Sequence, residues 1–593
     1  MPTPLTYPGV YIEEIPSGVR TITGVATSIT AFVGRTLRGP VDEPITINSF
    51  SDFERNFGGL WVESTLSYAV RDFYLNGGSQ AIIVRLYAAQ AGQNDKSKLN
   101  VAGLTLKASY QGGWGMNLRA TVDTDVSKEV ANRMALNPSY TEKPDEQLFN
   151  LTVRDTSPGG AVERFLNLTI IPNKARSIDK VLNAESNLVG WDGSLPTHLP
   201  KPIDDVYKAQ TALADAKKAS TPVDANIKKA QDAVDDAKKG LDDDITKAEK
   251  HLAATKKVSP PVEADIINSA QTAVNTAKSG IQASDGAVLG KSDFTPTNGE
   301  SEKKGLYALE KADLFNLLCI PPFAPEGDVE PALVAEAAVY CEKRRAMLIV
   351  DPPSSWTDKT KAKNEFTDPD KEYVGTRSKN AAIFFPRLKQ PNPLRDNQVE
   401  TFVPCGVIAG IFARTDAQRG VWKAPAGLDA TLIGVPQLSV PLTDAENGEL
   451  NPLGINCLRS FPVAGRVVWG ARTLRGADQL ADEYKYIPVR RLALFIEESL
   501  YRGTQWVVFE PNDEPLWAQI RLNLGAFMNN LFRQGAFQGR TPQEAYFVKC
   551  NSETTTQNDI NLGIVNIVVG FAPLKPAEFV VIKIQQIAGQ IAA

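Results

Sequence analysis

Two widely separated strand–helix–strand patterns constrain the fold of this chain more than any other feature. Their strands are short and almost wholly apolar, which is typical of a parallel sheet that helices cover on its faces. The expected elements are a strand at 29–34, helices at 50–57 and 64–75, strands at 81–86 and 314–320, a helix at 334–345 and a strand at 346–350. We therefore predict one discontinuous α/β body that is interrupted by insertions.

The first insertion is predicted to be a small antiparallel β domain. Its expected strands are 104–108, 118–122, 149–154 and 165–170. Turns between them are indicated by Gly112-Gly113 and by Pro158-Gly159-Gly160.

The second insertion, at 204–283, is rich in Ala, Lys and Asp and contains an internal repeat of about 40 residues. Ala and Lys favour helix, and the apolar stripe is thin. We expect a solvated helical bundle outside the main core, with a charged, partner-binding role as the alternative.

The last third of the chain alternates helices with strands. We expect helices at 486–501, 515–534 and 542–545 and strands at 506–510, 547–550 and 560–571. At 593 residues the chain is too long for a single core, so we expect three or four folded units.

Both ends of the chain have the two-residue period of a strand. Near the start, Val10 and Ile12 share one face on either side of Tyr11, and near the end Val580, Ile582 and Ile584 share a face. A terminal strand with an apolar face needs a sheet to join, in its own molecule or in a neighbour. We expect two β arms that link adjacent copies.

The fold class is thus an α/β (α+β) multidomain chain. We divide it into an N-terminal arm (1–20), the first part of the core (21–90), an inserted β domain (91–200), a helical-repeat insertion (201–300), the second part of the core (301–475), a C-terminal domain (476–576) and a C-terminal arm (577–593).

Composition excludes several classes of protein. The net charge of -5 and the pI of about 5.5 argue against a nucleic-acid coat. No apolar run approaches the ~20 residues of a membrane helix, and no signal peptide is visible at the start. The five cysteines lie far apart without metal-ligand spacing, so we expect reduced, buried thiols.

The sequence contains little catalytic chemistry. His198 and His251 are the two histidines, and neither lies in a metal-binding spacing. Gly290-Lys291-Ser292 lacks the upstream strand and glycine spacing of a phosphate loop, so we interpret it as linker. Asp351 follows a strand, where an α/β enzyme could place a carboxylate, but Pro352 and Pro353 favour a turn. We predict a non-enzymatic protein without cofactor or metal.

Gly, Pro, Trp and Arg are instead dense in a block that runs from 416 to 427, through 450–456, to 467–474. One interpretation is turns, with Trp422 and Trp469 filling gaps in the core. The block nevertheless resembles the contractile tail sheath family of bacteriophages and related injection systems. The likeness extends to Tyr7–Glu14, Ala31–Gly34, Val489–Leu492, Phe509–Asn512, Ala545–Cys550 and Pro573–Phe579.

The resemblance implies a structural subunit that forms hexameric rings, stacked helically around an inner tube. Such a sheath is assembled on a baseplate in a stretched state and shortens when triggered, without consuming a cofactor. It implies partners in the inner tube, the baseplate and terminal cap proteins, with no direct nucleic-acid binding and no membrane insertion. Assembly is expected in the bacterial or host cytoplasm, and the product is part of a virion or injection particle.

In that family the C-terminal domain faces the tube, partly through basic helix residues. The matching candidates here are Arg490, Arg491, Arg502, Arg521 and Arg533. Internal salt bridges are the alternative role for each of them.

Two other functions remain open at this stage. A non-contractile tube or a surface-lattice protein would also use terminal strands for assembly. A hydrolase on the α/β body lacks a nucleophile–base pair. The sequence does not distinguish a phage tail from an injection device, but the neighbouring genes would. Capsid and terminase genes indicate a virus, whereas toxin genes and an ATPase gene without a capsid gene indicate an injection device.

Overall fold

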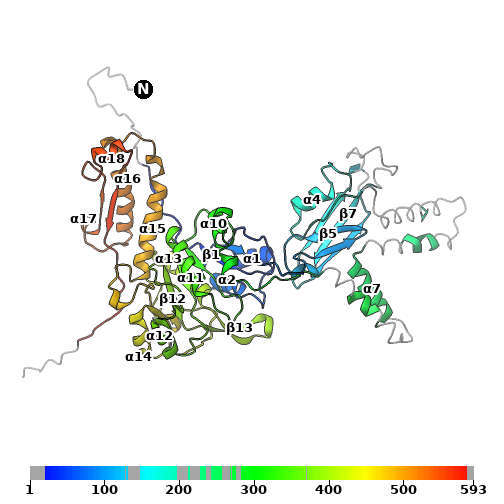
Figure 1. The fold of residues 1–593 in the computed structure, drawn as a ribbon, viewed down its shortest axis with the longest axis horizontal. Helices are drawn as coiled ribbons and strands as arrows, with labels where there is room; N and C mark the ends of the chain where they lie inside the picture. The colour runs from blue at the N-terminus through cyan, green and yellow to red at the C-terminus, as the bar shows by residue number, and fades with distance from the viewer. Residues whose placement is uncertain are drawn as a thin grey trace, which may run out of the picture.

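The computed structural model describes residues 20–126, 129–130, 147–196, 212–213, 228–234, 242–256, 268, 270–275, 282–368 and 370–583. An α/β body lies in the middle of the molecule, with the C-terminal domain at one end and the inserted β domain at the other (Figure 1). The predicted mixed α/β class is confirmed.

An eight-stranded sheet forms the centre of the body, in the order β17-β16-β12-β11-β10-β1-β3-β2. Its strands are β1 (Thr30–Gly34), β2 (Ile45–Ile47), β3 (Ala81–Arg85), β10 (Leu317–Cys319), β11 (Met347–Val350), β12 (Ala381–Phe385), β16 (Ile455–Phe461) and β17 (Gly465–Val468). The edge strands β2 and β17 are antiparallel to their neighbours, and the inner strands are parallel. Because β1 pairs with β10, from Thr30 opposite Leu317, the two predicted patterns form one discontinuous sheet.

Side-chain alternation along the sheet creates two separate cores. On β1, Ala31 and Val33 belong to one core and Phe32 to the other, as the two-residue period requires. The first core is covered by α11 (Pro331–Lys343), α12 (Lys359–Thr367) and α14 (Asp444–Leu450), and the second by α1 (Phe50–Phe57), α2 (Thr65–Leu75) and α13 (Cys405–Arg419).

Two glycines let α13 lie directly against α2. A Cβ on Gly406 would come within 2.1 Å of the Ala69 carbonyl oxygen, and one on Gly410 within 2.5 Å of the Phe73 oxygen. Neither atom is a flexible side-chain end, so only glycine permits this approach. The close contact fixes α13 on the sheet face that it covers.

The inserted β domain contains two three-stranded antiparallel sheets. They comprise β4 (Lys98–Val101), β5 (Leu104–Ala108) and β9 (Val189–Trp191), and β6 (Leu118–Asp123), β7 (Phe149–Asp155) and β8 (Val162–Leu168), with α4 (Ile178–Glu185) beside them. Their inward faces form a third core. The four strands predicted here are confirmed, with shifts of a few residues in β8.

Parts of the predicted helical repeat lie outside the described residues. Helix α7 (Asp244–Lys256) is described, and it begins against the β domain. The Asp243 carboxylate accepts hydrogen bonds from the main chain of Ala120, at 2.9 Å, and of Thr246, at 2.9 Å. One carboxylate thus joins the start of this helix to β6.

The C-terminal domain is built on two long helices, α15 (Ile487–Gly503) and α16 (Glu514–Arg533), and has its own core. Smaller elements complete it: α17 (Pro542–Ala545), β18 (Tyr546–Lys549), α18 (Gln557–Asn561) and β19 (Val568–Phe571). The three predicted helices and the strand at 547–550 are confirmed.

Two strand predictions in this domain are wrong. Residues 505–507 form a 3₁₀ turn instead of a strand, because the chain must reverse between α15 and α16. The range 560–571 is divided between α18 and β19, since Thr556 and Asp559 form a capping box that starts a helix.

The remaining elements lie at the edges of the body. They are the antiparallel strands β13 (Leu388–Asn392), β14 (Gln398–Phe402) and β15 (Gln437–Leu438) and the short helices α9 (Lys291–Phe294) and α10 (Gly299–Glu302). All five cysteines are buried and unbridged, as predicted. Within the described ranges, no helix has both the length and the apolar character needed to cross a membrane.

Candidate functional site: assembly surfaces of the C-terminal domain

The predicted C-terminal arm leaves the domain as an extended segment. After β19 the chain runs past the body to the end of the described residues (Figure 1). Val580 is 81% exposed and Ile582 is 80% exposed. The neighbouring side chains of Phe579 and Val581 are exposed to a similar degree. Apolar residues therefore face solvent on both sides of a segment that belongs to no ladder among the described residues.

The other predicted arm positions, Val10, Tyr11, Ile12 and Ile584, lie outside the described residues. Their role as strand positions stays a prediction. At the N-terminal end the described chain begins at Arg20, whose main-chain N–H donates to Asn523 Oδ1 at 3.0 Å and whose guanidinium stacks on Trp506. Residue 20 is thus held on the C-terminal domain.

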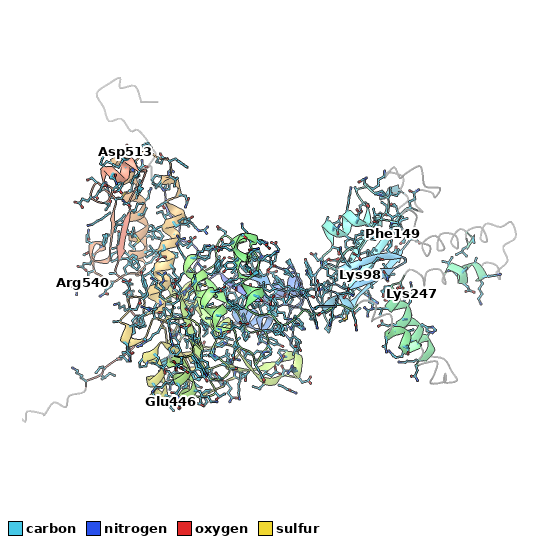
Figure 2. All side chains as sticks on the ribbon, viewed as in Figure 1. Lys98, Phe149, Lys247, Glu446, Asp513 and Arg540 are labelled. Carbon is cyan, nitrogen blue, oxygen red and sulfur yellow. The ribbon has the colours of Figure 1, made fainter. Side chains whose placement is uncertain are left out.

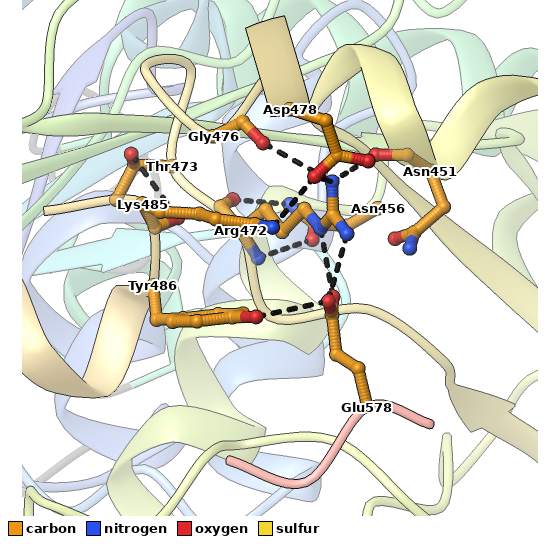
Figure 3. A network of polar contacts seen from close by, with 9 residues as sticks. All are labelled: Asn451, Asn456, Arg472, Thr473, Gly476, Asp478, Lys485, Tyr486 and Glu578. Atoms are coloured by element: carbon orange, nitrogen blue, oxygen red, sulfur yellow. Dashed lines mark hydrogen bonds and ion pairs between the residues drawn. The ribbon is translucent and has the colours of Figure 1, made fainter. Parts of the chain in front are cut away.

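An ion pair anchors the C-terminal segment to the body. Arg472 Nε and Nη2 each donate to the Glu578 carboxylate at 2.7 Å, and the Tyr486 hydroxyl donates to it at 3.0 Å (Figure 3). Arg472 itself has a fully buried side chain. Its third nitrogen donates to the carbonyl oxygens of Asn451 and Gly476 and to Asp478.

This network gives each of the three nitrogens of a buried guanidinium at least one acceptor, which favours a stable buried charge. Burial opposes ionisation of Glu578, but the hydrogen bonds from Arg472 and Tyr486 outweigh it and lower the pKa of that carboxyl. The carboxylate stays charged near neutral pH, and the segment is fixed at this point.

The antiparallel pair of β18 and β19, called the hairpin below although α18 lies between its strands in the sequence, is a second candidate surface. It is a sheet of two strands only, so each strand has an edge without a ladder partner within the described part of the chain. Phe547 lies opposite Gly570, and the Phe547 ring covers the position of a side chain there. Exposed edges of this kind can accept an added strand.

A groove of about 910 Å³ lies between the body and the anchored segment. Trp422 and Trp469 line it, together with Leu574 and Pro576 of the segment. Both tryptophans are half-buried. Trp422 packs against the core of the C-terminal domain, as the core-filling interpretation predicts, whereas Trp469 packs on Phe461. Basic side chains at the groove are Arg419, Lys423 and Lys575.

The structure corrects the tube-contact prediction for two of the five arginines. Arg491 and Asp416 form an ion pair at 2.6 Å whose side chains are 3% and 4% exposed. Arg490 is buried as well, and it donates to Asn380 at 2.9 Å and to Glu497 at 3.2 Å. Both guanidiniums connect α15 to the body, so neither can reach another molecule directly.

The other three arginines are at least partly exposed. Arg502 pairs with Asp313 and Glu498, both at 2.7 Å. Arg521 pairs with Glu514 at 2.6 Å, and Arg533 is exposed at the end of α16. Tube contact stays a prediction for these three side chains.

Asp351 contacts the start of α13 and also lines a second pocket, of about 340 Å³, together with Arg387. Its Oδ1 accepts the Cys405 N–H at 2.9 Å, at the start of α13, while its Oδ2 is buried without a hydrogen-bond partner. Burial raises the pKa of Asp351 to about 7, despite opposing effects of the Cys405 hydrogen bond and Arg387. Among the residues described, no group of three or more His, Cys, Asp or Glu side chains is placed to hold a metal ion.

Comparison with protein families gives two adjacent matches to this chain. Residues 298–474 match the model of the phage tail sheath protein central domain, and residues 481–587 match that of the phage tail sheath C-terminal domain. These two segments are similar to the central and C-terminal domains of phage tail sheath proteins. The two matched segments contain the groove, the Arg472–Glu578 pair and the hairpin.

Individual relatives agree with this assignment. A tail sheath protein of Vibrio phage KVP40 is 33% identical over 137 residues, which is 23% of this chain and 20% of the relative. A prophage major tail sheath protein of Pseudomonas aeruginosa is 25% identical over 287 residues, 46% of this chain and 67% of the relative. The match thus spans only a fifth of the Vibrio phage protein.

Among solved structures, the crystal structure of a sheath tail protein from Listeria innocua has the same fold. Its TM-score is 0.50 with 12% sequence identity, over 93% of this chain and 96% of that one.

The sequence patterns include both Arg472 and Glu578, but they do not predict that the two side chains bind each other. Arg472 lies in the dense block at 467–474, and Glu578 lies in the family-like stretch at 573–579. A signal was present, because an arginine in a core-adjacent turn needs an anionic partner. The sequence offered many carboxylates, so only the fold could select Glu578.

Proposed function

We propose that this chain is the repeating subunit of a contractile sheath. Copies assemble as helically stacked hexameric rings around an inner tube, and the sheath shortens to drive the tube through a target envelope. The matches of residues 298–474 and 481–587 to phage tail sheath domains support this function. The observation that carries it is an anchored C-terminal segment whose apolar side chains have no partner within the described chain.

In this proposal the C-terminal arm adds a strand to a neighbouring copy. The partner edge is on the hairpin of β18 and β19, where strand edges are unpaired within the described chain. Four or five added main-chain hydrogen bonds contribute a net ~0.5–1.5 kcal/mol each. Burial of Val580 or Ile582 adds about 1.5–3 kcal/mol per side chain. Arms held this way keep copies connected while their bodies rotate.

The N-terminal arm, with Val10, Tyr11 and Ile12, is proposed to act in the same way. Arg20, where the described chain begins, is held on the domain that carries the hairpin, whereas the C-terminal arm is anchored on the body by Glu578. Linking through both ends gives each copy connections to more than one neighbour, as a cylinder requires.

Contact with the inner tube is proposed for Arg502, Arg521 and Arg533. They lie on α15 and α16 and are partly or fully exposed. An acidic tube surface would attract them, and the attraction between exposed charges weakens at high salt. Baseplate and terminal cap proteins are proposed as further partners, at the two ends of the cylinder.

The test is electron microscopy of the purified chain, assembled with its inner tube protein. Cylinders in a long narrow state and a short wide state are expected, with no added nucleotide. A single invariant diameter would indicate a non-contractile tube, and flat arrays would indicate a surface lattice.

A further inference from the structure

A fully exposed phenylalanine marks the turn between α15 and α16. Phe509 is 101% exposed and Val508 beside it is 59% exposed. The Phe509 backbone has φ of 71°, a left-handed conformation that is costly for a bulky residue. Such strained residues tend to cluster at functional positions, and nothing in the described chain covers this side chain.

The turn itself is held rigidly. The Asn512 side chain donates to the Ile564 carbonyl oxygen at 3.0 Å and accepts from Trp517 Nε1 at 2.9 Å. Glu510 N donates to the Val507 oxygen at 3.2 Å. We call residues 508–510 the tip. Because the tip is preorganised, burying Phe509 in a partner costs little conformational entropy.

The charges around the tip are mainly acidic. Glu510 is exposed directly beside Phe509, and Asp513 and Glu514 follow. Asp513 caps α16 through the Leu516 N–H, and Glu514 pairs with Arg521. Arg20 lies on Trp506 nearby. Glu510 is therefore the exposed charge closest in sequence to Phe509, and the tip offers an aromatic ring with an adjoining carboxylate.

The groove between Trp422 and Trp469 has the complementary chemistry. Its acidic residues are already engaged, because Glu578 binds Arg472 and Asp444 pairs with Arg459. Lys423 Nζ donates only to the main-chain oxygens of Ala424 and Ala426, at 2.9 and 3.3 Å. Arg419 is 60% exposed, at 4.0 Å from the exposed Asp429.

Burial and the neighbouring Arg419 both lower the pKa of Lys423. The groove is lined by Arg419, Lys423 and Lys575, while its two carboxylates pair with Arg459 and Arg472. Positive charge is thus in excess there, and a carboxylate from another molecule would reduce that excess. Aromatic walls with basic side chains at their edge suit an aromatic residue beside an acidic one.

The tip and the groove cannot meet within one molecule. Figure 2 labels Asp513, which follows the tip, at the top of the molecule, and Glu446 at the bottom. Glu446 belongs to α14, the helix that borders the groove. A contact between them therefore joins two copies. Because it uses different surfaces on the two partners, repeating it generates a ring or a helix.

We propose that the Phe509 tip of one copy docks in the Trp422–Trp469 groove of the next copy. Phe509 lies between the tryptophans, and Glu510 lies toward Arg419 and Lys423. This contact rests on the proposed sheath function and adds a packing interface to the strand exchange of the arms. Aromatic anchors seated in a pocket usually dominate such interfaces.

The direct test replaces Phe509 with p-benzoylphenylalanine, in the full chain assembled on its tube, followed by irradiation and mass spectrometry. Cross-links between copies are expected from position 509 to residues 419–427 or 469–471. Cross-links to the tube protein, to an arm segment or to any other surface would overturn the proposal.

Substitutions provide a second test. Phe509→Gly removes the ring and relieves the left-handed strain, so the melting temperature of the monomer should stay equal or rise. The concentration needed for cylinder formation should nevertheless rise roughly tenfold. Val463→Ala is the matched control, since Val463 is also 101% exposed, and it should assemble normally.

A charge exchange separates this contact from general surface effects. Glu510→Arg and Arg419→Glu should each weaken assembly, and the double variant should restore it. Failure of the double variant to recover, or normal assembly by Phe509→Gly, would overturn the docking while leaving the sheath function intact. Absence of cylinders from the unmodified chain would instead overturn the sheath function.

Discussion

Arg472 and Glu578 form a two-point ion pair although 106 residues separate them in the sequence, with both nitrogen–oxygen distances at 2.7 Å. The pair connects a turn of the central domain to the start of the C-terminal arm. A bidentate contact fixes direction as well as distance. It therefore determines where the arm leaves each copy.

Glu578→Gln should loosen the arm without unfolding the chain. The substitution leaves Arg472 with Asp478 as its charged partner and removes a charge-assisted contact worth about 1.5–3 kcal/mol. We expect faster protease cleavage after residue 572 and fewer cylinders by electron microscopy. Glu553→Gln, at an exposed glutamate, is the control, and equal cleavage of the two variants would contradict an anchoring role.

Val580→Asp combined with Ile582→Asp should abolish assembly and leave the monomer as stable as before. Both side chains are about four-fifths exposed in the isolated chain, so their replacement removes no internal packing. Sedimentation measures assembly, and thermal unfolding measures stability. Val463→Asp, at a fully exposed valine outside the arm, should assemble normally. Cylinders formed by the double variant would contradict the arm hypothesis.

Arg491→Ala and Arg533→Ala should have opposite effects. Loss of Arg491 leaves Asp416 buried and unpaired, which costs about 3–5 kcal/mol of unfolding free energy. Loss of the exposed Arg533 should change stability little but weaken binding to the inner tube, most visibly at low salt. Chemical denaturation and a tube-binding assay at two salt concentrations measure these effects. A destabilised Arg533→Ala variant would indicate an internal role instead.

Asp351 should make the protein less stable as pH rises from about 4 to 7. Its pKa is about 7 in the folded chain, against an ordinary value of 3.8 for an Asp carboxyl, so the folded state binds more protons in that interval. Asp351→Asn keeps an oxygen for the Cys405 N–H and removes the buried charge. The melting temperature of this variant minus that of the unmodified chain should grow with pH and level off above about 7. A constant difference would show that Asp351 does not titrate there.

The main architecture was predictable because local patterns report burial directly. The apolar strands at 29–34, 81–86 and 346–350 and the helices at 486–501 and 515–534 are confirmed as elements. The segment at 506–510 has the composition of a strand, but the chain reverses direction there. It forms a turn because the two helices on either side of it pack against each other.

The five candidate arginines also show which properties the sequence predicts and which depend on tertiary packing. All five had the residue type expected of a tube-facing helix. Sequence could not separate the buried Arg490 and Arg491 from the exposed Arg533, because the distinction depends on where α15 meets the body.

By itself the sequence determined most of the strands and helices, that one discontinuous α/β body joins distant parts of the chain, and which family the chain resembles. These properties follow from periodicity, which neighbouring residues specify among themselves. The tertiary structure decided that Arg472 binds Glu578, that Trp422 and Trp469 line a groove, and that Phe509 stands uncovered. Such relationships join residues distant in sequence, and only the packing of complete elements brings them together or keeps them apart.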